Sequence, residues 1–191
     1  LPMPFRRYQI AKVWRAERPG RGRFREFMQC DVDIIGVKSL VADAECLQIC
    51  AAVLEALGLR GPGEGDAQYR VRVNNRRLLN EILTEFGVTE TPRVHGTLRV
   101  VDKLEKIGRE KVVEGLVGDV AWAPSDAGRF LDLLEGDWRA AQDVVGEDSA
   151  GLGELRRLLE LANAAGIGGI VEVDLTIARG LDYYTGTIYE T

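Results

Sequence analysis

Five arginines lie between positions 15 and 25 of the chain, together with a single acidic residue, Glu17. Arginine keeps its charge at physiological pH, and its planar group of N–H donors fits phosphate oxygens. Arg15, on a rigid strand, could fix one phosphate of a nucleoside triphosphate. Arg21, Arg23 and Arg25, in or just after a loop, could close over the other phosphates. Glu17 could pair with Arg15 or Arg25, or accept a hydrogen bond from the adenine amine. As an alternative, this basic hairpin tip is only a solvated surface.

Three polar residues, Gln29, Asp31 and Asp33, alternate along the stretch that follows the arginines. Alternate residues of a strand point to the same face, so these three side chains should share the face of Arg25. Amide and carboxylate groups there could bind an amino group or an imidazole. As the alternative, the two carboxylates are exposed acids on an edge strand.

A second candidate site lies near the end of the sequence, where Arg179 precedes Gly180 and the pair Tyr183 and Tyr184 follows. Glycine permits a tight turn, so the guanidinium of Arg179 could stand at the end of a sheet within reach of a ligand. The alternative is a structural arginine bonded to carbonyl oxygens, with both tyrosines in the core.

The arginines must be positioned by a hairpin, because two strand-like stretches at residues 8–17 and 24–35 flank a loop at 18–22 that contains proline and glycine. Ser39 and Gly58 are placed to begin and end an amphipathic helix between them. Further elements are expected as a helix at 41–57, a strand at 69–73, a helix at 76–86, and strands at 170–174 and 183–190.

Residues 93–165 differ from the rest because they are rich in charge and glycine and give mainly helical patterns. We therefore predict an α+β fold. Residues 1–92 and 166–191 should form its core, and residues 93–165 a helical insertion.

The composition argues against several classes of protein and of metal site. The formal charge of −5 argues against a general nucleic-acid coat, and no apolar run reaches the roughly 18 residues of a membrane-spanning helix. No signal-peptide core is present at the start, so a cytoplasmic location is expected. Cys30, Cys46 and Cys50 form no C-x-x-C pair, and Cys46 and Cys50 are expected in the core, with metal binding as the alternative. His95 is the single histidine, expected in a loop or at a helix start, so a multi-histidine metal site is excluded.

The basic hairpin, with its R-x-E, a loop and then F-R-x-F, resembles motif 2 of the class II aminoacyl-tRNA synthetases over residues 8–36. This resemblance implies that Arg15 contacts the α-phosphate of ATP and that Glu17 contacts adenine. Arg23 and Arg25 would contact the outer phosphates or the loop itself.

The terminal stretch from Arg179 to Thr187 resembles the signature of the histidyl-tRNA synthetases. In that family the matching arginine stabilises charge on the α-phosphate, so Arg179 is implied in catalysis beside Arg15 and also in histidine binding. Tyr184 would face the imidazole of histidine, and Tyr183 would help line its pocket.

The positions of Gln29 and Asp33 also belong to the family's histidine pocket, although many relatives have glutamate at the second. Two further stretches, 73–79 and 101–104, resemble the family at positions that look structural.

The resemblance implies a class II synthetase-like antiparallel sheet flanked by helices. It also implies a histidine–tRNA ligase that makes histidyl-adenylate from histidine and ATP, then charges tRNA(His). Mg²⁺ would accompany ATP, bound mainly through the phosphates. The intact protein would be a homodimer.

Motif 1, motif 3 and an anticodon-binding domain are not found in these 191 residues. We therefore expect a central part of a catalytic domain that is poorly active alone and whose open sheet edges favour association. One alternative is the synthetase-like regulatory subunit of ATP phosphoribosyltransferase, which tends to lose the arginines present here. Another is a degenerate synthetase-like module that senses histidine or uncharged tRNA.

Overall fold

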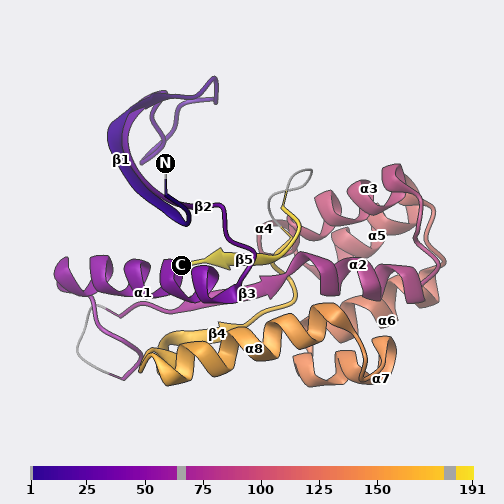
Figure 1. Cartoon of the computed structure of the whole chain (residues 1–191). Helices are drawn as coiled ribbons and strands as arrows, with labels where there is room; N and C mark the ends of the chain where they lie inside the picture. The colour runs from indigo at the N-terminus through magenta and orange to yellow at the C-terminus, as the bar shows by residue number, and fades with distance from the viewer. Residues whose placement is uncertain (1, 64–67, 179–183) are drawn as a thin grey trace.

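The computed structural model describes residues 2–63, 68–178 and 184–191. The chain begins with an antiparallel hairpin of β1 (Phe5–Trp14) and β2 (Glu26–Ile35), which curves away from the rest of the molecule (Figure 1). Its tip closes through paired backbone hydrogen bonds between Gly20 and Arg23, each 3.0 Å long. Gly22 has a φ of +73°, a conformation that glycine adopts at little cost.

The hairpin was predicted correctly, but β1 begins and ends three residues earlier than the sequence pattern suggested. Its ladder continues as far as a bond of 2.8 Å from the Arg15 N–H to the Arg25 carbonyl. Beyond that point Pro19 lacks an N–H donor, so the loop is longer than expected.

Helix α1 (Leu40–Ala56) follows the hairpin and lies within one residue of its predicted bounds. Ser39 caps its first turn, with its hydroxyl oxygen accepting from the Val41 N–H at 3.2 Å. Gly58, with a φ of +88°, follows its last turn. Both signals were local in sequence, which is why this helix was predictable.

The second sheet has the order β4-β3-β5. Strand β3 (Val71–Asn75) pairs antiparallel with β5 (Thr187–Glu190) and parallel with β4 (Val171–Val173). The predicted α+β class is confirmed, with the addition of this one parallel pair. The last strand begins at Thr187 rather than at 183, and Tyr183 lies outside the described residues.

Helices make up the middle of the chain. Helix α2 (Arg76–Glu85) starts directly from β3, capped by the Asn75 side chain, which accepts from the Leu78 N–H at 3.1 Å. The helices that follow are α3 (Thr91–Val101), α4 (Leu104–Ile107), α5 (Arg109–Val120), α6 (Pro124–Glu135), α7 (Ala141–Val145) and α8 (Ala150–Ala164), with short 3₁₀ turns η1 (Trp138–Ala140) and η2 (Gly168–Ile170). None of them is long and apolar enough to cross a membrane within the part of the chain that the structure describes.

The helices form two groups around the three-stranded sheet. Helix α8 packs against α1, α2 and β3, whereas α3, α5 and α6 lie at the opposite end of the molecule from α1 (Figure 1). A cluster of Phe86, Trp122 and Phe130, with ring centroids 4.8–5.7 Å apart, fills the centre of the second group. The division into a core and an insertion at residues 93–165 stays a prediction.

The cysteines and the single histidine differ in burial and lie on different elements. Cys50 is half-buried and packs against the core, Cys46 is half-buried, and Cys30 on β2 is exposed. His95 lies in α3, four residues after its first residue, Thr91.

Candidate functional site

The hairpin presents one polar face. Register pairs Ala11 with Gln29, Gln9 with Asp31 and Arg7 with Asp33, so Gln29, Asp31 and Asp33 point to one side, as their alternation predicted. We call this side, with Arg7 and Arg15, the polar face of the hairpin.

Side chains on the polar face are linked by hydrogen bonds. Nη2 of Arg15 donates to Oε1 of Gln29 at 2.9 Å, and Nε2 of Gln29 donates to Oδ1 of Asp31 at 2.5 Å. The Arg15 guanidinium also lies 5.0 Å from the centre of the Phe27 ring, an arrangement favourable for a cation. Arg15 lies one residue beyond the end of β1, not on the strand as expected, and is held beside a residue predicted to bind histidine. At the other end of this face, Nε of Arg7 binds Oδ2 of Asp33 at 2.5 Å.

The ion-pair partner of Glu17 differs from the expected one. The Glu17 carboxylate pairs with Arg23, at 2.9 Å from its Nε, and not with Arg15 or Arg25. The tight turn at Gly20–Arg23 folds the chain back, which brings Arg23 beside Glu17. Arg25 instead donates from Nε to the backbone carbonyl of Glu17 at 3.2 Å. The Arg23 side chain is largely exposed and that of Glu17 partly so, which makes the pair weak and able to open for a ligand.

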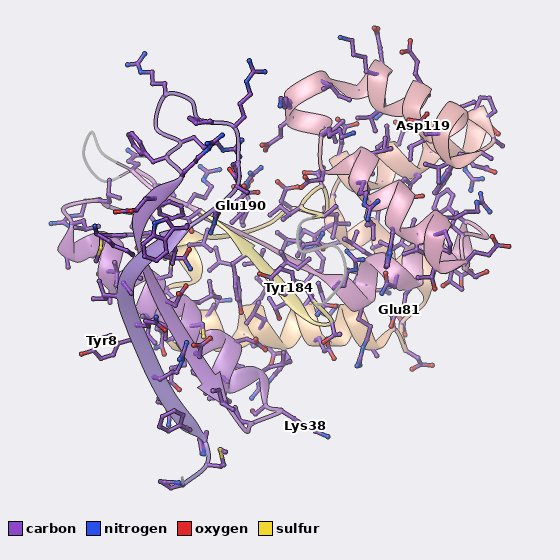
Figure 2. The ribbon with its side chains drawn as sticks, turned by 90° about the horizontal axis from the view of Figure 1, so that it is seen from above. Tyr8, Lys38, Glu81, Asp119, Tyr184 and Glu190 are labelled. Atoms are coloured by element: carbon purple, nitrogen blue, oxygen red, sulfur yellow. The ribbon has the colours of Figure 1, made fainter. Side chains whose placement is uncertain are left out.

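The second candidate site is described only in part. Arg179 and Tyr183 lie outside the described residues, whereas Tyr184 is exposed (Figure 2). The segment before Arg179 is well packed, with Leu175, Ile177 and Ala178 buried. The expected convergence of Arg15 and Arg179 on one phosphate therefore stays a prediction.

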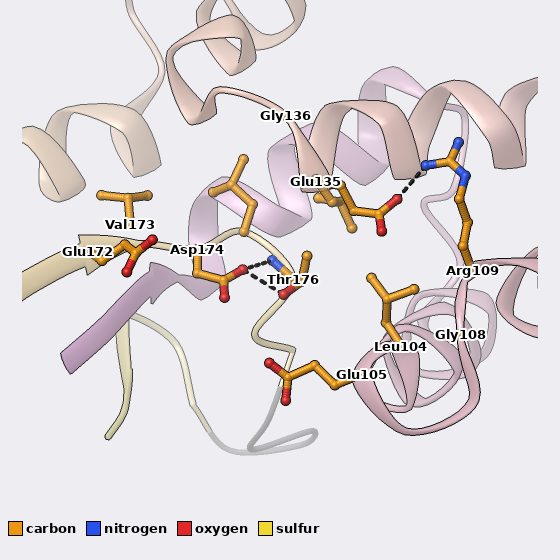
Figure 3. Close-up of a pocket in the computed structure, with 12 residues that line it drawn as sticks. Leu104, Glu105, Gly108, Arg109, Glu135, Gly136, Glu172, Val173, Asp174 and Thr176 are labelled. Carbon is orange, nitrogen blue, oxygen red and sulfur yellow. Dashed lines mark hydrogen bonds and ion pairs between the residues drawn. The ribbon is translucent and has the colours of Figure 1, made fainter. Parts of the chain in front are cut away.

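A pocket of about 480 Å³ lies between β4, α4 and α6 (Figure 3). Its charged lining residues are engaged with one another or with neighbours: Arg109 binds Asp132 at 2.5 Å and also binds Glu135. Glu105 is bound by Arg72. In the described part of the chain, no group of three His, Cys, Asp or Glu side chains is arranged to hold a metal ion.

The comparison with known proteins decides the family. A model of the family described as histidyl-tRNA synthetase matches residues 2–191. The chain belongs to the histidyl-tRNA synthetase family.

The sequence similarity to relatives extends along the whole chain. Histidine–tRNA ligases of Gloeobacter violaceus and Xanthomonas axonopodis pv. citri are 39% and 42% identical to it, over 100% of its residues but only 41% and 42% of their own. A crystal structure of histidyl-tRNA synthetase from a Nostoc species matches with a TM-score of 0.82 at 31% identity, covering 100% of this chain and 44% of that one. The chain thus spans about two fifths of the length of these relatives.

The description of a further structural neighbour names two kinds of protein. A Bacillus halodurans protein described as an ATP phosphoribosyltransferase regulatory subunit/histidyl-tRNA synthetase matches with a TM-score of 0.78 at 23% identity, over 99% of this chain and 48% of its own. At that identity the likeness shows the fold alone.

Within this synthetase fold, the sequence reasoning missed two residues of β3, Arg72 and Asn74. Arg72 binds Asp174 at 3.0 Å, Glu190 at 3.2 Å and Glu105, so it joins α4 to the sheet. Its hydrogen bond with Glu105 raises the pKa of Arg72, aided by the nearby charges of Asp174 and Glu190. Asn74 is fully buried and contacts the segment before Arg179. The signal available was a strand that ends in polar residues, Asn74 and Asn75, where apolar ones are expected.

Proposed function

We propose that this chain forms the central part of the catalytic domain of a histidine–tRNA ligase. The observation that supports this most directly is the Arg15–Gln29 bond of 2.9 Å, which holds a cation beside a residue proposed to bind histidine. In the first step, a carboxylate oxygen of histidine attacks the α-phosphorus of ATP, and pyrophosphate leaves. In the second, a ribose hydroxyl at the end of tRNA(His) attacks the carbonyl carbon, and AMP leaves.

The phosphate groups are held by cations in this proposal. Arg15 and Arg179 stabilise charge on the α-phosphate, the group where charge builds up during attack. Arg23 and Arg25 reach the outer phosphates, and Glu17 accepts from the adenine amine. This requires the exposed Glu17–Arg23 pair to open, which costs little in water. The reaction then needs positioning and charge stabilisation rather than a protein nucleophile.

Histidine is held by polar groups in the same proposal. Gln29 and Asp33 contact it from the hairpin, and Tyr183 and Tyr184 contact the imidazole from the other side. Asp33 is engaged with Arg7 in the free chain, at 2.5 Å, so binding exchanges one cationic partner for another group with N–H donors.

Mg²⁺, a homodimeric assembly and a cytoplasmic location complete the proposal. A magnesium ion would neutralise charge on the phosphates of ATP. It would be bound mainly through them.

The regulatory subunit of ATP phosphoribosyltransferase is the alternative, and the Bacillus halodurans neighbour, whose description names such a subunit, shares the fold. Such subunits tend to lack the arginines that would contact ATP. Since Arg15, Arg23, Arg25 and Arg179 are all present in this chain, the ligase is the better supported function.

Histidine-dependent ATP–pyrophosphate exchange by the full-length protein that carries this chain tests the proposal. Arg15→Ala and Arg179→Ala should each lower the exchange rate about 100-fold or more, because each removes a charge from the α-phosphate. Arg157→Ala removes an exposed arginine of α8 and should leave the rate unchanged. Histidine binding without exchange in the unmodified protein would favour the regulatory subunit. Exchange that survives Arg179→Ala would refute the role of that residue.

A further inference from the structure

The side-chain amide of Gln29 lies between a cation and an anion on the polar face of the hairpin. Its oxygen Oε1 accepts from Nη2 of Arg15 at 2.9 Å, and its nitrogen Nε2 donates to Oδ1 of Asp31 at 2.5 Å. An amide oxygen only accepts and an amide nitrogen only donates, so these two partners fix which end of the amide faces which neighbour. The reversed amide would lose both bonds and set its oxygen against the carboxylate.

The hairpin itself brings these groups together. Gln29 and Asp31 are alternate residues of β2, so their side chains share one face. Arg15 is placed beside them by its backbone N–H, which donates to the Arg25 carbonyl at 2.8 Å. Its guanidinium lies 5.0 Å from the centre of the Phe27 ring, which belongs to the same face. The Gln29 amide is therefore held at both ends by groups that the hairpin positions.

The two carboxylates of the polar face have different partners. Asp33 binds Nε of Arg7 on the neighbouring strand at 2.5 Å. Asp31 has no ion pair in the part of the chain that the structure describes, and its carboxylate accepts instead from Gln29. A hydrogen bond to a charged acceptor is stronger than one between neutral groups. Arg7 thus holds Asp33, whereas Asp31 holds Gln29.

We infer that Asp31 is a positioning residue for histidine binding and acts through Gln29. The inference rests on the proposed function, in which Gln29 contacts histidine. With one bond made by its oxygen and one by its nitrogen, the amide keeps one acceptor site and one N–H for a ligand. Because Asp31 and Arg15 hold the amide, both groups are oriented before histidine binds. Preorganised contacts lose less conformational freedom on binding, which favours affinity.

A direct ion pair between Asp31 and histidine is the competing role, and two substitutions separate it from positioning. Asparagine at this position keeps an oxygen that can accept from Gln29 but loses the negative charge. A positioning role therefore tolerates Asp31→Asn, whereas an ion pair with the ligand does not. Asp31→Ala removes the acceptor as well as the charge, so it abolishes either role.

The motion of the Gln29 amide in the chain itself tests the link. In Asp31→Ala, the NMR order parameter of the Gln29 side-chain amide should fall below about 0.6, the range of flexible groups, and in Asp31→Asn it should stay near its original value. Glu26→Ala is the matched control, because Glu26 is an acid of β2 on the opposite face, bound to Lys12 and Trp14. An unchanged amide in Asp31→Ala, or an equal change in Glu26→Ala, would refute the link.

Steady-state pyrophosphate exchange by the full-length protein tests the consequence for binding. Asp31→Ala should raise KM for histidine about tenfold and leave kcat within about threefold, because it removes binding shared by the ground state and the transition state. KM for ATP should also stay within about threefold, since Arg15 remains held over Phe27. Asp31→Asn and Glu26→Ala should resemble the unmodified protein. A fall in kcat with KM for histidine unchanged would contradict the inference.

A double-mutant cycle decides whether Asp31 acts through Gln29. In a Gln29→Ala protein, Asp31→Ala should change KM for histidine by less than about twofold, because the group that Asp31 positions is already absent. A further tenfold rise, or an Asp31→Asn protein as impaired as Asp31→Ala, would show direct contact and refute the positioning role. No exchange by the unmodified protein would overturn the proposed function and the part of Asp31 in it. Normal exchange by Asp31→Ala would overturn the inference alone.

Discussion

Arg6 of β1 and Glu45 of α1 form a two-pronged ion pair, with Nε–Oε1 and Nη2–Oε2 distances of 2.6 and 2.8 Å. Arg6 pairs with Ile34 in the hairpin, so its side chain lies on the face opposite Gln29. The pair therefore ties the face of the hairpin opposite Gln29 to α1. Through it, α1 helps to orient the residues proposed to bind ATP and histidine.

The pKa of Glu45 should report on this pair. It lies below the ordinary value for glutamate, mainly because of the hydrogen bond from Arg6. A lowered pKa means that the pair stabilises the fold above the ordinary glutamate range and that this contribution is lost as pH falls through the lowered pKa. In Arg6→Ala, carboxyl NMR should show Glu45 titrating at higher pH. Glu26, whose pKa is lowered by Lys12 and Trp14, is the control and should not move. An unmoved Glu45 would mean that the pair is not formed in solution.

Two glycines of α8 should respond oppositely to alanine. A Cβ at Gly151 would lie 2.3 Å from the backbone nitrogen of Leu78 and 2.5 Å from its Cα, so α8 could no longer pack as closely on α2. Gly151→Ala should lower the free energy of unfolding by about 1–3 kcal/mol. A Cβ at Gly153 would meet nothing within 4 Å, and Gly153→Ala should raise it by about 0.5–1 kcal/mol because alanine favours a helix. Urea unfolding measures both values. A neutral Gly151→Ala would contradict the close packing of these helices.

Asp43 should make the fold less stable as pH rises. Burial raises the pKa of Asp43, and the charge of Glu154 raises it further. The folded state therefore favours the protonated form of Asp43. Protonated Asp43 stabilises the fold below the ordinary pKa of aspartate, and this contribution is lost as pH rises through the raised pKa. Asp43→Asn should raise the melting temperature at neutral pH and change it little near about pH 3, where both residues are uncharged.

Asp137→Asn provides a control of opposite sign for that experiment. A backbone hydrogen bond from Arg139 lowers the pKa of Asp137, so the ionised form is the one that stabilises. Its asparagine variant should melt lower at neutral pH. The same direction of change in both variants would refute the assignment for Asp43.

Much of this architecture could be predicted from the sequence because its signals are local. The alternation of Gln29, Asp31 and Asp33 predicted a shared face, and Ser39 and Gly58 predicted the ends of α1, each from residues close together in the chain. Family membership could likewise be inferred from two short motifs.

Long-range pairings could not be predicted in the same way. The parallel pairing of Val71 with Val171 and the bond from Asn74 to Leu175 join residues about a hundred positions apart, and no local periodicity encodes them. The pairing of Glu17 with Arg23 was also missed, because it depends on how the turn at Gly20–Arg23 folds back. The site residues proposed for ATP and histidine remain predictions for the exchange assays.

The back face of the hairpin should make this chain associate with itself. Tyr8, Ile10 and Trp14 alternate along β1 and are 75%, 61% and 69% exposed. Met28, which pairs with Lys12, lies on the same face and is 60% exposed. A two-stranded ribbon with an uncovered apolar face is marginally stable in water, and its unpaired edges invite further strands. Sedimentation velocity should therefore show larger species as concentration rises.

Ile10→Lys tests the assignment of that association to the hairpin. A charge in the middle of the apolar face should shift the chain toward the monomer, because burying the ammonium group would require its desolvation. Val53→Lys places the same charge on an exposed position of α1, 49% exposed, and should leave the association unchanged. An unmodified chain that is monomeric at every concentration and melts in one cooperative transition would contradict the predicted association through the hairpin. Equal effects of both substitutions would assign the association to net charge rather than to the apolar face.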